Sequence, residues 1–186
     1  MSEQDAEDKR LIAMEDFCSI LDLSASAKYD GTIEVTARGL RSFSTDPVAD
    51  IDLLYRRAIF AWLIADGDMH LKNLAMLKTV EPGTKAFTSV RVAPLYDAVT
   101  TGVFPGLAGD RMALNLNGKD DHLGRDDFLA TARTIGLTAA QAEAGLVELA
   151  ARLSKRRPLP CPDSAERSWP QNKLLRRGPW TSQATE

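Results

Sequence analysis

The sequence is poor in cysteine and histidine and has no long apolar run. Two cysteines among 186 residues, Cys18 and Cys161, are too few for a disulfide framework. No apolar run approaches the roughly 20 residues that a membrane-spanning helix needs, and the acidic, polar start Met1–Asp5 does not resemble a signal peptide. We therefore expect a cytoplasmic protein with no membrane partner, in which Cys18 is a buried and reduced thiol.

An excess of positive charge is lacking as well. Lysines and arginines number 23 against 26 aspartates and glutamates, which gives a formal net charge of −3. A chain with this balance has no general attraction to nucleic acid or to an anionic membrane surface. The basic runs 155–157 and 176–177 could touch nucleic acid, but such runs are more typical of solvated surface. Strong direct contact with DNA is therefore not expected.

The remaining composition is typical of one globular domain. Hydrophobic residues make up 44% and charged residues 26%, a balance that allows a core of useful size. Polar residues 1–8 predict a flexible N-terminus. Residues 158–186 are rich in proline and show no hydrophobic period, which predicts a disordered tail. We expect residues 9–157 to form the folded domain.

Hydrophobic periodicity predicts a mainly α fold. Apolar residues spaced three and four apart predict an amphipathic helix over 9–21. Residues 32–36 alternate, which predicts a short strand or an extended connection. Thr45 or Asp46 is expected to cap a helix from about 48 to 65. That helix is apolar nearly all round, which is typical of the buried centre of a domain.

After this helix the pattern changes to short strands and loops. Asp66-Gly67 predicts a turn, and two apolar stretches predict a small β-hairpin over 74–92. The glycine-bearing segment 98–125 predicts a loop. Two further helices are expected at about 126–136 and 139–154.

Charged side chains between two apolar elements mark the candidate site. Residues 66–73 connect the buried helix to the first hairpin strand, and burying such charges without partners would be costly. Asp68 and Asn73 have the spacing of a kinase catalytic loop, in which an Asp faces the substrate hydroxyl and an Asn holds one Mg²⁺. Asp97 follows the hairpin, where a second metal-binding Asp is needed, and Lys72 could offset phosphate charge.

On these residues the sequence resembles the HipA family of toxin kinases, whose catalytic loop reads Asp-x-His-x-Lys-Asn. The resemblance extends over about residues 10–153 and combines the catalytic loop with a metal-binding Tyr-Asp segment. The matching stretches are Glu15–Cys18, Ser26–Tyr29, Asp68–Asn73, Pro94–Asp97, Met112–Lys119 and Asp126–Phe128.

The resemblance implies the C-terminal lobe of a protein-kinase-like fold and a role for each site residue. Asp68 would be the catalytic base, with Asn73 and Asp97 as Mg²⁺ ligands. The nucleotide and its phosphates would be bound by His70, Leu71, Lys72, Asn73, Tyr96 and Asp97. ATP would be the phosphate donor, and the acceptor a serine of a protein such as an aminoacyl-tRNA synthetase. The expected partner is a HipB-type helix-turn-helix antitoxin.

One part of such a kinase is not found in the sequence. Kinases of this family carry an N-terminal lobe with a phosphate-binding loop and a strand lysine. The glycine-bearing segment 102–109 is not followed by Lys-Ser or Lys-Thr, so it is not a Walker loop. We therefore expect very low kinase activity from this chain alone, which would be either incomplete or dependent on an N-lobe from another polypeptide. The alternative is a non-catalytic interaction module that binds a HipB-type antitoxin or a second chain.

Two other interpretations of the polar cluster fit less well. Asp66, Asp68 and His70 alternate as in a phosphoesterase metal site, but such a site needs more ligands, and His122 is the only other histidine. As an EF-hand, the run that starts at Asp66 has leucine both where glycine and where glutamate is needed.

Overall fold

The computed structural model describes residues 12–104 and 111–154. In chain order the elements are β1 (Ile12–Asp16), α2 (Phe17–Ile20), η1 (Ala25–Ala27), α3 (Ile33–Phe43), α4 (Pro47–Ile64), η2 (Leu71–Asn73), β2 (Ala75–Thr79), β3 (Ser89–Val92), η3 (Thr101–Val103), α5 (Arg125–Thr134) and α6 (Ala139–Ser154). The fold is helical with one small antiparallel sheet. The predictions for residues 1–8 and 158–186 fall outside the described residues.

Helix α4 is the central element of the domain. Asp46 caps it by accepting the N–H of Ala49 (3.3 Å), and Pro47 occupies the first turn, where its missing N–H is not needed. Ten of its 18 residues are buried, and the helix ends at Ala65 in the left-handed conformation (φ 55°). The predicted buried helix and its Asp46 cap are therefore confirmed.

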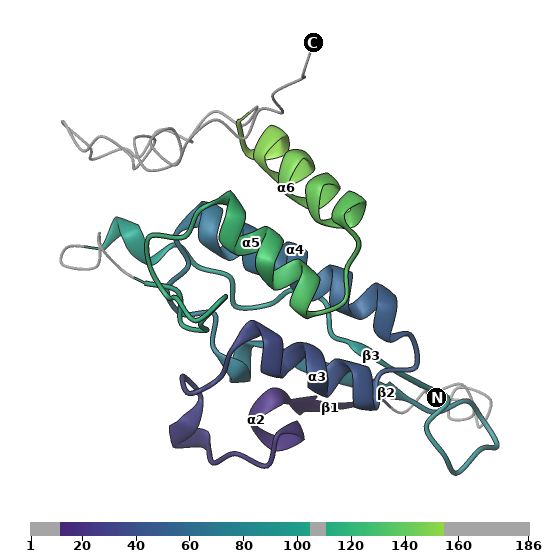
Figure 1. Cartoon of the computed structure of the whole chain (residues 1–186). Coiled ribbons are helices and arrows are strands. Elements are labelled where there is room, and N and C mark those ends of the chain that lie inside the picture. Colours follow the sequence, from purple (N-terminus) through teal and green to yellow (C-terminus); the bar gives the residue numbers. More distant parts are fainter. Residues whose placement is uncertain (1–11, 105–110, 155–186) are drawn as a thin grey trace.

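The other long helices pack around α4. Helices α3 and α6 both contact it, and α5 contacts α3 and α6 (Figure 1). The largest fully buried side chains include Phe17 from α2, Leu40 from α3, Leu54 and Tyr55 from α4, and Phe128 from α5. The two helices predicted after the glycine-bearing loop are confirmed as α5 and α6. Among the described residues, no helix is long and apolar enough to cross a membrane.

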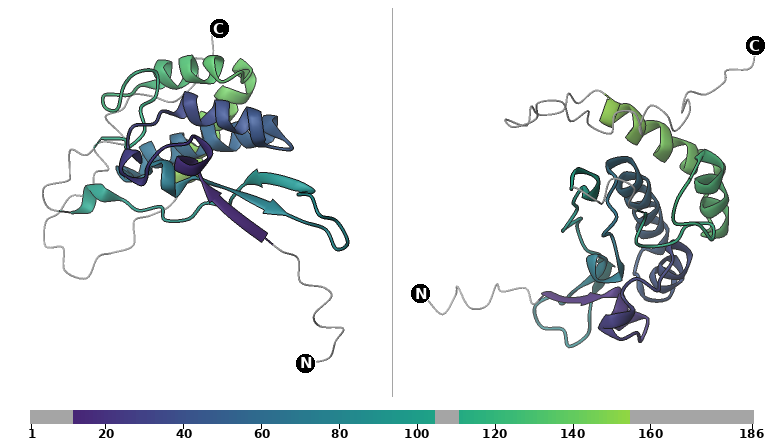
Figure 2. Two further views of the ribbon diagram at one scale, coloured as in Figure 1. Left: turned by 90° about the horizontal axis from the view of Figure 1, so that it is seen from below. Right: turned by 90° about the vertical axis from the view of Figure 1, so that its left-hand side faces the viewer.

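Strands β2 and β3 form the predicted hairpin. They pair antiparallel from Met76 opposite Val92 to Thr79 opposite Ser89, and their connecting turn projects beyond the helices (Figure 2). On α4, Asp50 accepts the Val92 N–H (3.1 Å), while Arg57 donates to the Ala93 carbonyl. The central helix thus holds the strand that leads to Asp97.

The prediction of a helix over residues 9–21 is wrong for the first half of that segment. Residues 12–16 form strand β1, which pairs antiparallel with β2, Met14 opposite Leu77, and completes a sheet of order β1-β2-β3. Ile12 and Met14 stay exposed, so the strand is held by pairing with β2 rather than by a buried helical face. Only α2 keeps the predicted helical form, and its Cys18 is a buried free thiol, as expected.

The strand or extended connection predicted at 32–36 is also wrong. Thr32 makes one parallel bridge with Asn115 and then caps α3, accepting the N–H of Val35 (3.1 Å). Ile33, Ala37 and Leu40 lie buried on one face of this helix. Their spacing of four and three residues is helical, and it decides the segment over the short alternation at its start.

Candidate functional site

The polar loop (residues 66–73) leaves the end of α4 through a tightly bonded turn. The Asp66 N–H bonds to the Ala61 carbonyl (2.8 Å), and the Thr101 hydroxyl accepts from Gly67 N–H (3.0 Å) while donating to the Ala65 carbonyl (3.0 Å). The loop then enters η2, whose Leu71 and Asn73 are buried. The path of the loop is therefore fixed by backbone and hydroxyl contacts before any ligand is considered.

The structure brings Asn73 and Asp97 together. The Asn73 side-chain amide donates to Asp97 Oδ2 at 3.0 Å and lies 3.4 Å from the Asp97 carbonyl oxygen. Asp97 is exposed and has a positive φ of 53°, a conformation that Asp tolerates better than most residues. Next to it, the Tyr96 hydroxyl donates to the Lys72 carbonyl at 2.8 Å. Tyr96 and Asp97 are thus both hydrogen-bonded to the polar loop.

The donor set at Asn73 and Asp97 fits Mg²⁺. Magnesium takes oxygen ligands and is usually held by one or two carboxylates together with water and substrate phosphates. Asp97 offers an exposed carboxylate and Asn73 an amide oxygen at the same place. Within the part of the chain that the structure describes, no cluster of three or more His, Cys, Asp and Glu side chains could hold a metal.

Asp68 and His70 are met by residues from the loop before α3. The Tyr29 hydroxyl donates to Asp68 Oδ1 at 2.7 Å, and Lys28 Nζ lies 2.9 Å from His70 Nε2. His70 is buried, whereas the Asp68 side chain keeps 43% of its surface exposed. Sequence reasoning placed Lys28 and Tyr29 only in a matching stretch. No local pattern could show that they reach across about 40 residues of sequence to the polar loop.

Lys72 is engaged by Asp16, a residue that the sequence did not connect with the site. Lys72 Nζ lies 2.6 Å from Asp16 Oδ2, and Asp16 also caps α2 by accepting the Ser19 N–H at 3.1 Å. Burial favours a higher pKa for Asp16, but the bonds from Lys72 and Ser19 outweigh it and lower the pKa. The same hydrogen bond to Asp16 raises the pKa of Lys72. Lys72 thus lies at the site as a cation that already has a partner.

Asp66 is a buried acid beneath the site. Its Oδ1 accepts the Asp68 N–H at 3.0 Å, and 3% of its surface is exposed. Burial raises the pKa of Asp66, and the negative charges of Asp68 and Asp97 raise it further against the backbone bonds that lower it. Asp66 therefore holds the backbone of the polar loop at Asp68.

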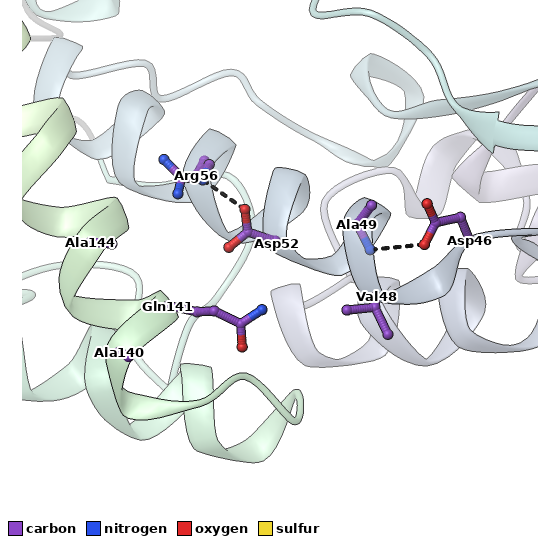
Figure 3. Close-up of a pocket in the computed structure, with 8 residues that line it drawn as sticks. All are labelled: Asp46, Val48, Ala49, Asp52, Arg56, Ala140, Gln141 and Ala144. Atoms are coloured by element: carbon purple, nitrogen blue, oxygen red, sulfur yellow. Dashed lines mark hydrogen bonds and ion pairs between the residues drawn. The ribbon is translucent and has the colours of Figure 1, made fainter.

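A shallow pocket of about 470 Å³ lies between α4 and α6 (Figure 3). It is lined by Asp46, Val48, Ala49, Asp52, Arg56, Ala140, Gln141 and Ala144. Its polar side chains already serve the helices, since Asp46 caps α4 and Arg56 Nε bonds Asp52 Oδ2 at 2.7 Å. The pocket lies beside the first half of α4, whereas the polar loop begins after the C-terminal end of that helix. None of the predicted site residues lines it.

Two curated proteins of Sinorhizobium fredii are similar to this chain in sequence. They are named "Putative kinase Y4mE" and "Putative kinase Y4dM", and each is 32% identical, over 109 and 108 residues. The matches cover 56% and 57% of this chain but 24% of each relative. The chain therefore spans about a quarter of the length of the curated relatives it matches.

The fold is similar to that of a solved toxin–antitoxin complex of Shewanella oneidensis MR-1, which contains HipA, HipB and its operator DNA. The TM-score is 0.64 at 19% identity, over 79% of this chain and 38% of the matched chain. A family model described as the HipA-like C-terminal domain matches residues 4–156. The resemblance found in the sequence is thereby confirmed. The chain belongs to the HipA-like C-terminal domain family.

Proposed function

We propose that this chain carries the catalytic loop and the metal ligands of a HipA-type serine/threonine protein kinase. The observation that carries the proposal is the contact between Asn73 and Asp97. These residues are 24 positions apart, yet the Asn73 amide lies 3.0 Å from Asp97 Oδ2. A kinase needs this pair of side chains at one place, because they hold the metal ions that neutralise the transferring phosphate. The kinase names of two relatives support the same chemistry.

The other residues take roles that follow from their positions. Asp68, partly exposed and fixed by Tyr29, accepts the proton of the substrate hydroxyl. Lys72 leaves its ion pair with Asp16 and binds phosphate oxygens of the nucleotide instead. Mg²⁺ bound with ATP supplies charge neutralisation, and Asn73 and Asp97 are the residues of this chain that hold it. Tyr96 ties the segment before Asp97 to the polar loop through its bond to the Lys72 carbonyl, and Leu71 is buried within that loop.

The biological setting is a toxin–antitoxin system of the HipA and HipB kind. The solved complex with a similar fold contains HipB and operator DNA, which supports a HipB-type antitoxin as partner. The phosphorylated substrate is a protein serine, as on an aminoacyl-tRNA synthetase. The N-lobe that binds the remaining ATP phosphates comes from a separate polypeptide or from another part of the kinase. In this setting the fold serves as the C-terminal lobe of a protein-kinase-like structure.

The experiment that tests the site uses Mn²⁺ as a paramagnetic substitute for Mg²⁺. Mn²⁺ is titrated into ¹⁵N-labelled protein with a non-hydrolysable ATP analogue, and the line broadening of each amide is followed by NMR. We expect broadening centred on Asn73 and Asp97. Asp97→Asn keeps the shape of the side chain and removes its charge, so the Mn²⁺ affinity should fall at least tenfold, about the loss that even an outer-shell partner brings.

A matched control is Asp121→Asn, which removes a carboxylate that pairs with exposed His122 at 3.3 Å. It should leave Mn²⁺ binding unchanged. Broadening centred on another part of the chain, or equal affinity in Asp97→Asn, would rule out the metal site. Binding to a HipB-type antitoxin without any metal or nucleotide binding would instead favour the non-catalytic interaction module.

A further inference from the structure

A short stretch before α3 lies along the polar loop, and its residue Lys28 has no role in the function proposed above. We call residues 28–31 the clamp segment. The Lys28 carbonyl accepts the Leu71 N–H at 3.0 Å, and Gly31 packs so closely on the Leu71 side chain that an added Cβ would lie 2.7 Å from Leu71 Cδ2. Backbone and packing therefore hold the clamp segment and the polar loop in one fixed register.

Within this register, the side chain of Lys28 contacts the imidazole of His70. Lys28 Nζ and His70 Nε2 are 2.9 Å apart. A lysine ammonium has only donors, so Nε2 must act as the acceptor. The imidazole is then neutral and carries its proton on Nδ1, a buried atom with no hydrogen-bond partner among the described residues. Free neutral imidazole in water favours the opposite tautomer, with the proton on Nε2.

The neighbouring residue Tyr29 contacts Asp68 of the polar loop. Its hydroxyl donates to Asp68 Oδ1 at 2.7 Å, and its ring meets the His70 ring edge-on, with centroids 5.1 Å apart. Because Oδ1 is occupied, Asp68 Oδ2 is the oxygen left to receive a proton from a substrate. His70 Nε2 is 3.9 Å from Asp68 Oδ1. A proton on Nε2 would let His70 compete with Tyr29 for that oxygen, and the bond from Lys28 prevents it.

We propose that Lys28 and Tyr29 are positioning residues of the phosphotransfer site, Lys28 by holding His70 as the Nδ1–H tautomer and Tyr29 by turning Asp68 so that Oδ2 faces the substrate. The inference rests on the proposed function for the role of Asp68. Its test needs no metal, nucleotide or turnover, so it can fail or succeed separately from the proposed function.

The first test reads the His70 tautomer directly. Long-range ¹H–¹⁵N NMR spectra of the imidazole rings separate protonated from unprotonated ring nitrogens, and the chain has only two histidines. His122, whose side chain is 93% exposed, serves as internal reference, and His122→Gln assigns the signals. We expect His70 to show a protonated Nδ1 and an unprotonated Nε2 in the wild type.

The variants then decide whether Lys28 is the cause. Lys28→Met keeps the aliphatic stem and removes the donor, so the His70 signals should move toward the Nε2–H form, while Lys28→Arg retains a donor and should keep Nδ1–H. Lys119→Met removes a lysine that bonds Asp127 (2.7 Å) elsewhere and should change nothing at His70. A wild-type His70 with its proton on Nε2, or a tautomer that Lys28→Met leaves unchanged, would overturn the inference for Lys28.

A second test addresses Tyr29. The hydrogen bond to Asp68 raises the pKa of the Tyr29 phenol. With ¹³C-labelled tyrosine, the ring carbon bearing the hydroxyl can be followed through a pH titration for each of the three tyrosines. Asp68→Asn should lower the pKa of Tyr29 toward its ordinary value and leave that of buried Tyr55 where it was. If Asp68→Asn leaves the Tyr29 titration unchanged, the contact does not exist in solution and Tyr29 does not position Asp68.

Discussion

At the scale of single residues, the candidate site is assembled from partners that are remote in sequence. Lys28 meets His70, Tyr29 meets Asp68, and Lys72 meets Asp16, with separations of 42, 39 and 56 positions. Each contact gives a buried or half-buried polar group a partner and so avoids the cost of leaving it unpaired. The charges gathered in the polar loop are tolerated for this reason.

Gly31 provides a test of this close packing. Gly31→Ala would place a Cβ 2.7 Å from Cδ2 of the fully buried Leu71, so that side chain would have to shift. Overpacking of this kind costs about 1–3 kcal/mol. We expect the free energy of unfolding, measured by urea denaturation, to fall by that amount.

Gly145→Ala in α6 is the matched comparison for Gly31→Ala. Its Cβ would meet Tyr55 at 3.4 Å, an ordinary contact, and alanine is the better helix former by about 1 kcal/mol. This variant should be as stable as the wild type or more so. A Gly31→Ala protein that unfolds at the wild-type urea concentration would show that the clamp segment can move away from the polar loop.

At the scale of elements, two acidic side chains join helices to neighbouring segments. Asp50 in α4 holds β3 through the Val92 N–H and through Arg91 (3.0 Å). Asp127 in the first turn of α5 accepts from the Gly124 N–H (3.0 Å) and from Lys119 (2.7 Å). In both cases a carboxylate fixed on a helix sets the position of a loop or strand that has little core of its own.

Asp127 gives a prediction with a defined dependence on pH. Burial favours a higher pKa, but the bonds from Lys119, Gly124 and Asn117 outweigh it and lower the pKa below 3.8. Because the folded-state value lies below the unfolded one, the stabilisation is present above pH 3.8 and is lost as the pH falls through the folded-state value. Asp127→Asn should cost about 1.5–3 kcal/mol at neutral pH, the range for hydrogen bonds to a charged group.

The measurement for Asp127→Asn is urea denaturation at neutral pH and at decreasing pH down to about 3. The gap in stability between the variant and the wild type should narrow as the solution becomes acidic. Asp126→Asn removes an exposed carboxylate of the same helical turn and should have an effect within about 0.5 kcal/mol. A gap that stays constant over this pH range would mean that the charge of Asp127 does not provide the stabilisation.

At the scale of the whole molecule, the proposed function assigns to this chain only part of what phosphoryl transfer needs. It provides the residues proposed as base and metal ligands and spans 24% of the length of its kinase-named relatives. We predict that the 186-residue chain alone turns over at least a hundredfold more slowly than the roughly 1–100 s⁻¹ typical of protein kinases. Losing one preorganised group already costs about 10²–10³ in rate.

The measurement is transfer of radiolabelled phosphate from ATP to an aminoacyl-tRNA synthetase by the purified chain. Asp68→Asn gives the background of the assay. Turnover in the ordinary kinase range by the chain alone would contradict the prediction. It would mean that the described residues bind the ATP phosphates without a glycine-rich loop.

The amino-acid sequence by itself determined the central helix, the hairpin, the last two helices and the family. These depend on local signals, such as the Asp46 cap, the apolar run that follows it and the spacing of Asp68 and Asn73. Such signals act over a few residues and survive without knowledge of the rest of the chain.

Only the tertiary structure decided β1 and the partners of the polar loop. Residues 12–16 have apolar spacings that suit a helix, but their backbone pairs with the distant strand β2. Ile12, for example, lies opposite Thr79, more than 60 positions later in the sequence. The contacts of Lys28 and Tyr29 likewise depend on how α2 and α3 place the clamp segment against His70 and Asp68. Pairing between distant segments leaves no period in the sequence, because its free energy depends on which surfaces the fold brings together.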